Sequence, residues 1–121
     1  MPVRSLRSSV LRWPDGGAVR EAARRWALDL LAVRPEVQRA GYFGSYATGR
    51  EGVGSDLDLV VVLDASGETF ERRGLLFDCS TLPVPCDLLV YTRDEFAALL
   101  SRGGRFAEEL TSRAVWFARP L

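Results

Sequence analysis

The chain has 121 residues, 47% of them hydrophobic, which is enough for one compact domain that needs neither a disulfide nor a metal to hold its core. Its 16 acidic residues balance 16 basic ones, and every basic residue is Arg, because the sequence contains neither Lys nor His. The balanced charge gives no strong signal for binding duplex nucleic acid. The absence of His excludes Ser/His/Asp and Cys/His nucleophile systems and His-based zinc sites.

Two features concern the cellular environment. Cys79 and Cys86 are accompanied by no other soft ligands, so we expect free thiols rather than a metal site. No apolar run approaches the roughly 20 residues that cross a bilayer, and residues 1–13 lack the apolar centre of a secretory signal. We therefore expect a cytoplasmic protein without membrane contact.

The first predicted elements precede a glycine-rich segment. A short strand is expected near residues 9–13, after which "WPDGG" breaks the chain and Asp15 is placed to cap a helix. Apolar spacings of three and four predict that helix over residues 17–33, and Pro35 ends it. The predicted buried stripe consists of Val19, Ala22, Ala23, Trp26, Leu30 and Val33, and the predicted i,i+4 ion pairs join Glu21, Arg25 and Asp29.

Two strands flank the glycine-rich segment. Residues 36–44 read as a weak strand, whereas residues 56–64, "DLDLVVVLD", form the strongest strand pattern in the chain. This second run is apolar on both faces after Asp58, which is typical of a central strand covered by helices.

The remaining elements complete an alternating pattern. Residues 68–77 are predicted to be helical and residues 83–91 to form a strand with prolines at its entry. Thr92 and Glu95 then form a capping box that opens a helix through Leu100, ending at Gly103. A short helix from Arg105 and a strand over residues 113–118 follow. The alternation predicts an α/β (α+β) fold, a single domain over residues 1–121 with a mixed β-sheet and flanking helices.

Two carboxylates open the strongest strand. Asp56 and Asp58 are separated by one residue, so in a strand both point to the same face. Two like charges that close repel each other, and desolvation adds to the cost unless a cation neutralises them. Because the available ligands are hard oxygens, the pattern indicates Mg²⁺ or Mn²⁺.

The glycine-rich segment before them favours a phosphate ligand. Gly44 and Ser45 follow the weak strand, and a turn of this kind brings backbone N–H groups and a hydroxyl close to an anion. Taken separately, such a loop is usually only a turn and an Asp-x-Asp only a strand end. Their combination favours a nucleoside triphosphate site. Asp87, within an apolar strand, is either a third carboxylate of this site or the buried partner of an Arg.

"GSYATGREGVGSDLD" with the later "CDLLV" resembles the minimal nucleotidyltransferases of the DNA polymerase β superfamily, whose signature is Gly-Ser, about ten residues, Asp-x-Asp and a later carboxylate. The resemblance implies a mixed sheet with flanking helices, two divalent metals and an NTP donor, with ATP the expected one. It implies that Gly44 and Ser45 hold the triphosphate and that Asp56 and Asp58 ligate both metals. Asp87 would ligate the catalytic metal and help deprotonate the acceptor hydroxyl.

The chain departs from the family pattern in one respect. Many relatives carry Arg in a Gly-Ser-x-x-Arg-Gly pattern, whereas here Thr48 precedes Gly49 and the Arg follows at position 50. Arg50 is either a substitute phosphate contact or, more simply, a solvated loop charge. Tyr46 is expected to pack rather than to stack on a ligand, and Trp13, Trp26 and Trp116 are expected in the core.

The resemblance also bears on partners. Minimal family members are often paired with a separate helical HEPN protein, in some cases as the antitoxin that nucleotidylates its toxin, so we expect such a partner here. The leading interpretation is an enzyme that transfers AMP from ATP to a hydroxyl acceptor. The alternative is a non-catalytic nucleotide-binding module that docks to a helical partner. A structural domain without a ligand leaves the clustered carboxylates unexplained.

Overall fold

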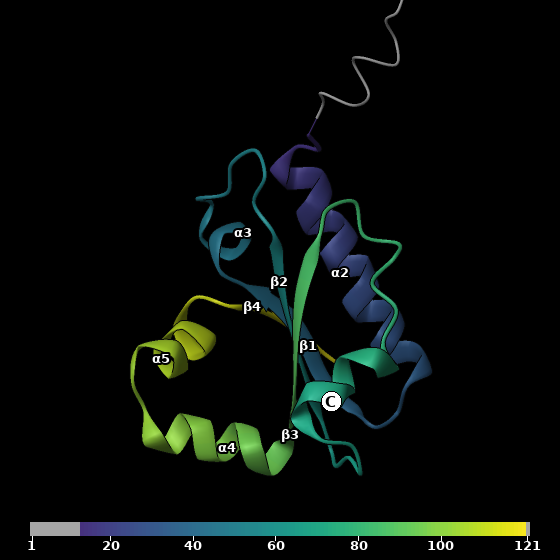
Figure 1. Ribbon diagram of the computed structural model, residues 1–121, viewed down its shortest axis with the longest axis vertical. Helices are drawn as coiled ribbons and strands as arrows, with labels where there is room; N and C mark the ends of the chain where they lie inside the picture. Colours follow the sequence, from purple (N-terminus) through teal and green to yellow (C-terminus); the bar gives the residue numbers. More distant parts are fainter. Residues whose placement is uncertain (1–12, 121) are drawn as a thin grey trace, which may run out of the picture.

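The computed structural model describes residues 13–120, in which helices and strands alternate (Figure 1). In chain order they are α2 (Gly16–Val33), β1 (Val37–Phe43), α3 (Ser45–Thr48), β2 (Leu57–Leu63), the 3₁₀ helix η1 (Phe70–Leu76), β3 (Cys86–Thr92), α4 (Arg93–Arg102), α5 (Arg105–Ser112) and β4 (Val115–Ala118). Most of the strand predicted near residues 9–13 lies outside the described residues, and Trp13 itself lies in no strand.

The strands form the mixed sheet that the sequence predicts. Their order is β3-β2-β1-β4, with β2 and β3 parallel and β1 antiparallel to both of its neighbours. Six of the seven residues of β2 are buried, which confirms it as a central strand. Within residues 13–120, β3 and β4 are the two edge strands of the sheet.

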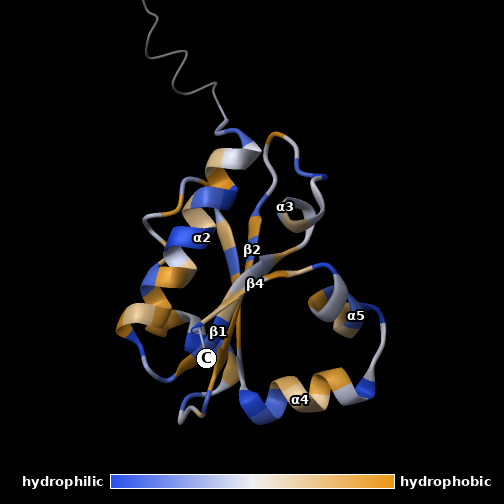
Figure 2. Ribbon diagram, turned by 180° about the vertical axis from the view of Figure 1, so that it is seen from behind, coloured by the Kyte–Doolittle hydropathy of each residue, from blue (hydrophilic) through white to orange (hydrophobic). Residues whose placement is uncertain are grey.

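The two faces of the sheet carry separate apolar clusters. Alternate residues of β2, including Leu57 and Leu59, pack with α2 on one face. Val60 and Val62 point to the other face, where they pack against Phe96 of α4 and Leu110 of α5. The result is a sheet between two helical layers, and Figure 2 shows apolar strands at the centre with amphipathic helices around them.

The helix starts follow the sequence signals closely. Asp15 accepts a hydrogen bond from Ala18 N at 2.8 Å and caps α2. The capping box is present, since Glu95 N donates to Thr92 Oγ1 at 3.2 Å and Thr92 N donates to Glu95 Oε1 at 2.9 Å. The helical prediction for residues 68–77 is confirmed for Phe70–Leu76, as a 3₁₀ rather than an α-helix.

The predicted stripe of α2 is partly wrong. Ala27 and Leu31 are buried, whereas Val33 is 73% exposed and Leu30 is half-buried. Val33, Leu30 and Trp26 share a flank of the helix that borders an open pocket, so the apolar spacing continues beyond the part that the sheet covers. Among the predicted ion pairs, Arg25 lies 3.5 Å from Glu21, and the structure forms no pair between Arg25 and Asp29.

An ion pair between buried Arg73 and exposed Glu95 joins η1 to α4. Arg73, 5% exposed, donates through Nη2 to Glu95 Oε2 at 3.0 Å and through Nη1 to Val90 O at 3.1 Å. This pair ties η1 to β3 and to the start of α4. Within residues 13–120 no helix combines the length and apolar character required to span a membrane.

Candidate functional site

The predicted site residues meet at one end of the sheet, where β1 ends and the other three strands begin. We call this end the carboxylate edge, to distinguish it from the edge strands β3 and β4. β1 ends where β2, β3 and β4 begin: Phe43 pairs with Asp58, and Tyr42 pairs with Val115. The Gly44–Ser45 turn, the Asp-x-Asp run and the start of β3 therefore lie together, although they are far apart in the sequence (Figure 1).

Asp58 and Asp87 occupy equivalent positions on neighbouring strands. They are register partners in the parallel β2–β3 pair. Both lie on the face where Val60 and Leu89, two residues further along each strand, pack against α4 and α5. Asp56 comes directly before β2, two residues ahead of Asp58. The structure thus brings the three predicted carboxylates to one edge of the sheet.

The buried position that one of the two interpretations gives Asp87 is wrong. Its side chain is exposed, and in the described part of the chain it forms no ion pair with Arg. The reason is that β3 is an edge strand and Asp87 is only its second residue, so α4 and α5 cover the strand further along. The interpretation of Asp87 as the buried partner of an Arg therefore has no support in the structure.

The electrostatic surroundings of Asp58 disfavour its charged form. Partial burial, followed by the charges of Asp87, Asp56 and Glu109, raises its pKa above the usual aspartate value. Such mutual repulsion, in a set of hard oxygen donors, is the electrostatic situation that a divalent cation relieves, so these residues fit Mg²⁺ or Mn²⁺. Within residues 13–120, however, no three acidic, Cys or His side chains lie close enough together to form a preformed metal site.

Gly44 brings the chain into close contact with Asp58. Its φ of 73° and ψ of −149° lie in a region that is accessible essentially only to glycine. A Cβ atom at this position would overlap Asp58 Oδ2. The Gly44 N–H donates to Glu109 Oε2 at 2.9 Å. The Glu109 carboxylate, from α5, therefore accepts the hydrogen bond of a backbone N–H that the sequence analysis assigns to phosphate.

Three further side chains near this site belong to the scaffold rather than to the chemistry. Tyr46 is 1% exposed and its hydroxyl donates to Ser55 O at 3.4 Å, which confirms that it packs. Cys86 and Cys79 are free thiols. Burial, with the charges of Cys79, Asp56 and Asp87, raises the pKa of the Cys86 thiol to about 11, so it stays protonated at neutral pH and is a poor nucleophile.

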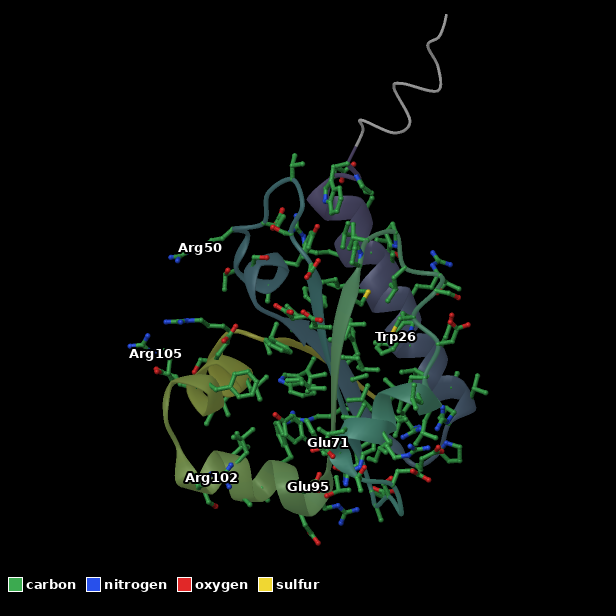
Figure 3. All side chains as sticks on the ribbon, viewed as in Figure 1. Trp26, Arg50, Glu71, Glu95, Arg102 and Arg105 are labelled. Carbon is green, nitrogen blue, oxygen red and sulfur yellow. The ribbon has the colours of Figure 1, made fainter. Side chains whose placement is uncertain are left out.

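A pocket of about 740 Å³ opens beside the Gly44–Ser45 turn. Arg50, Arg105 and Arg113 line it together with Gly44, Ser45, Thr48 and Glu109. Figure 3 shows Arg50 and Arg105 projecting on the same side of the molecule, from the loop after α3 and from the start of α5. Sequence reasoning missed Arg105, Glu109 and Arg113. Their spacing of four places them on one face of a helix, which is the signal that could have found them.

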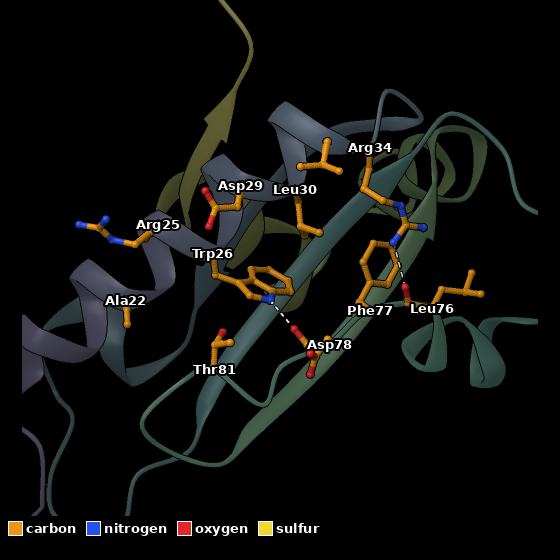
Figure 4. A pocket seen from close by; sticks show the side chains of 11 residues that line it. Ala22, Arg25, Trp26, Asp29, Leu30, Arg34, Leu76, Phe77, Asp78 and Thr81 are labelled. Atoms are coloured by element: carbon orange, nitrogen blue, oxygen red, sulfur yellow. Dashed lines mark hydrogen bonds between the residues drawn. The ribbon is translucent and has the colours of Figure 1, made fainter.

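A second pocket, of about 600 Å³, lies on the α2 face of the sheet (Figure 4). Trp26 and Phe77 line it, and two hydrogen bonds tie its walls together: Trp26 Nε1 donates to Asp78 O at 3.0 Å, and Arg34 Nη1 donates to Leu76 O at 2.9 Å. None of the predicted site residues lines this pocket. We therefore place the candidate site at the carboxylate edge.

Comparison with known families agrees with this geometry. The profile of the nucleotidyltransferase domain family matches residues 24–116, a range that contains all five predicted site residues. The chain therefore belongs to the nucleotidyltransferase domain family. A search of curated proteins finds no match.

Proposed function

We propose that this protein transfers AMP from ATP to a hydroxyl group of an acceptor. The observation that carries the proposal is the register pairing of Asp58 with Asp87 next to Gly44, in a chain of the nucleotidyltransferase family. A nucleotidyl transfer needs carboxylates beside a phosphate-binding turn, and these segments share one edge of the sheet.

The proposal includes two divalent ions, Mg²⁺ or Mn²⁺. Asp56 and Asp58 would hold both, and Asp87 would hold one of them. Bound there, the ions supply charge stabilisation for the attacking and leaving oxygens of an in-line displacement. The mutual repulsion that raises the pKa of Asp58 supports this assignment, because a cation would offset it.

The protein's own groups bind and orient the reactants. The Gly44 N–H and the Ser45 hydroxyl donate hydrogen bonds to phosphate oxygens once the nucleotide replaces Glu109. Asp87 accepts the proton of the acceptor hydroxyl, and its exposed position supports this, because an acceptor reaches it from solvent. The acceptor oxygen forms a bond to the α-phosphorus. The bond from that phosphorus to the bridging oxygen breaks, and pyrophosphate leaves with the electron pair.

For the acceptor we propose a hydroxyl of a separate helical protein of the HEPN type, as in a toxin–antitoxin pair. Two points support a macromolecular acceptor: Asp87 is exposed, and it lies on β3, an edge strand whose outer side carries no further strand in residues 13–120. An acceptor carried by a large partner can approach such an edge without having to enter a closed cavity.

Label transfer tests the proposal. The protein, Mg²⁺ and a cell extract are incubated with ATP labelled at the α-phosphate or at the γ-phosphate. Nucleotidyl transfer moves the α-label to an acceptor and releases the γ-label as pyrophosphate. Asp56→Asn serves as the inactive control, and Ser45→Ala should reduce transfer while the protein folds normally. Binding of ATP without α-label transfer would favour the non-catalytic binding module instead.

A further inference from the structure

The arginines of the described chain differ in whether they have a structural partner, and Arg102, on α4, is exposed and forms no carboxylate pair among the described residues. Most have a clear structural partner. Those paired with a carboxylate are Arg20, Arg24, Arg25, Arg34, Arg72, Arg73 and Arg93. Arg39 lies 4.0 Å from the ring centroid of Trp116, and Arg119 donates to backbone carbonyls at the end of α2.

Three arginines without such a partner gather in one place. Arg50, Arg105 and Arg113 are exposed and form no carboxylate pair among the residues that the structure describes. All three line the 740 Å³ pocket beside Gly44 and Ser45. The one carboxylate in that lining, Glu109, bonds to the Gly44 N–H instead. Three guanidinium groups around one pocket repel each other, so the pocket is suited to a multiply charged anion.

The order of the strands places this pocket relative to the carboxylates. Along the carboxylate edge, the strand order β3-β2-β1-β4 gives Asp87, then Asp58, then Gly44 after β1. α5, which leads into β4, comes last. Arg105 at the start of α5 and Arg113 directly after this helix therefore lie on the opposite side of Gly44 from Asp87.

We infer that Arg50, Arg105 and Arg113 form a subsite for the β- and γ-phosphates of the donor, with the leaving pyrophosphate directed toward α5. The inference rests on the proposed function and adds the direction in which the triphosphate lies across the site. The α-phosphorus lies near Asp56 and Asp58, the acceptor approaches at Asp87, and negative charge builds up on pyrophosphate at the arginines. Guanidinium groups bind phosphate oxygens in a bidentate manner, so they stabilise this leaving group.

In this arrangement, the Glu109 carboxylate occupies the position that we assign to a phosphate oxygen. It lies on α5, four residues after Arg105 and four residues before Arg113, the C-cap of the helix, and it accepts from the same Gly44 N–H that a phosphate oxygen would use. Entry of the triphosphate displaces this carboxylate. Glu109→Gln removes a negative charge from the subsite, so this variant should bind polyphosphate more tightly than the wild type.

Calorimetric titration with inorganic tripolyphosphate, ATP and AMP, each with Mg²⁺ at constant ionic strength, tests the subsite. Arg105→Gln and Arg113→Gln should each weaken tripolyphosphate and ATP binding about tenfold, as expected for a lost charge-assisted contact, and leave AMP binding unchanged. Arg102→Gln is the matched control, because Arg102 is exposed, forms no carboxylate pair in residues 13–120 and lines a different pocket, on α4. This control should bind all three ligands like the wild type.

Several outcomes would overturn the inference. They are absence of tripolyphosphate binding by the wild type, unchanged binding by the Arg105→Gln/Arg113→Gln double variant, or an equal loss in Arg102→Gln. Circular dichroism checks that each variant folds. If a change in or next to α5 affects folding, Arg50→Gln, in the loop after α3, provides an independent variant. If tripolyphosphate binding depends on the arginines but the α-label is never transferred, the proposed function fails and the anion subsite stands.

Discussion

Asp58 and Asp87 are register partners on parallel strands, and they present their carboxylates on the same face of the sheet. Without a cation, this arrangement costs stability. Partial burial and the charges of Asp87, Asp56 and Glu109 together raise the pKa of Asp58. Without a cation, the end of the sheet that carries these carboxylates is therefore less stable than the same end with neutral side chains.

The first prediction is that Asp58→Asn stabilises the metal-free protein at neutral pH. Between the ordinary aspartate pKa of 3.8 and the raised folded value, the folded state binds more protons than the unfolded state, so wild-type stability falls as pH rises through that interval. The Asp58→Asn variant has no carboxyl group at this position, so it does not lose this stability as pH rises. Thermal melting in EDTA should show a stability advantage of the variant that is small in acid and larger at neutral pH. A variant that melts below the wild type at pH 7 would contradict the repulsion.

The second prediction separates the carboxylates by what they bind. Asp56→Asn should weaken MgATP binding and abolish transfer together. Asp87→Asn should abolish transfer while ATP affinity survives, because the lost interactions are made with the acceptor and in the transition state. Asp87 is exposed and unpaired with Arg in the described chain, and its charge repels Asp58, so its loss should leave the metal-free melting temperature at or slightly above that of the wild type. Melting and calorimetry of both variants check this, and a lowered melting temperature for Asp87→Asn would assign Asp87 to the scaffold.

The third prediction concerns the close approach at Gly44. Gly44→Ala combines a forbidden backbone region with an overlap between the new Cβ and Asp58 Oδ2. Gly49→Ala is the matched control, because Gly49 also has positive φ, at 75°, but open space around it. The control should cost about 1 to 2 kcal/mol of the free energy of unfolding. Gly44→Ala should cost clearly more in chemical denaturation, and equal losses would show that Asp58 does not crowd this position.

The fourth prediction tests the link between the helical layers. Arg73 is nearly fully buried, and its hydrogen bonds lower the pKa of Glu95 to about 2. Glu95→Gln keeps an acceptor for the capping box but removes the charge, and should cost about 1 to 3 kcal/mol at pH 7. Because the folded pKa is depressed, this contribution is complete above pH 4.5 and disappears as pH falls toward 2. Denaturation of wild type and variant should converge in that window, and a pH-independent difference would refute the ion pair.

Local signals predicted most of the fold. The Asp15 cap, the Thr92–Glu95 box and the apolar run of β2 depend on residues close together in the sequence, and the structure confirms all three. The sequence left open whether Asp87 is a site carboxylate or the buried partner of an Arg, because its exposure depends on β3 being an edge strand, which only the complete sheet order determines.

The candidate site was predicted in part for the same reason. The turn at Gly44 and the carboxylates at Asp56 and Asp58 lie within one short segment, so their spacing alone indicated a site. Arg105, Glu109 and Arg113 are about sixty residues away and reach Gly44 only because α5 leads into β4, the neighbour of β1. Their spacing of four marks a helix face but does not indicate what that face contacts.

The most direct test of the central claim is calorimetric titration of the wild-type protein with ATP, once in Mg²⁺ and once in EDTA. We assign the carboxylates of Asp56 and Asp58 to cations that accompany the triphosphate, so a triphosphate without these cations meets uncompensated negative charge. We predict binding in Mg²⁺ and an affinity at least about tenfold weaker in EDTA. Equal affinity in the two titrations would contradict the claim that these carboxylates form a metal-dependent nucleotide site.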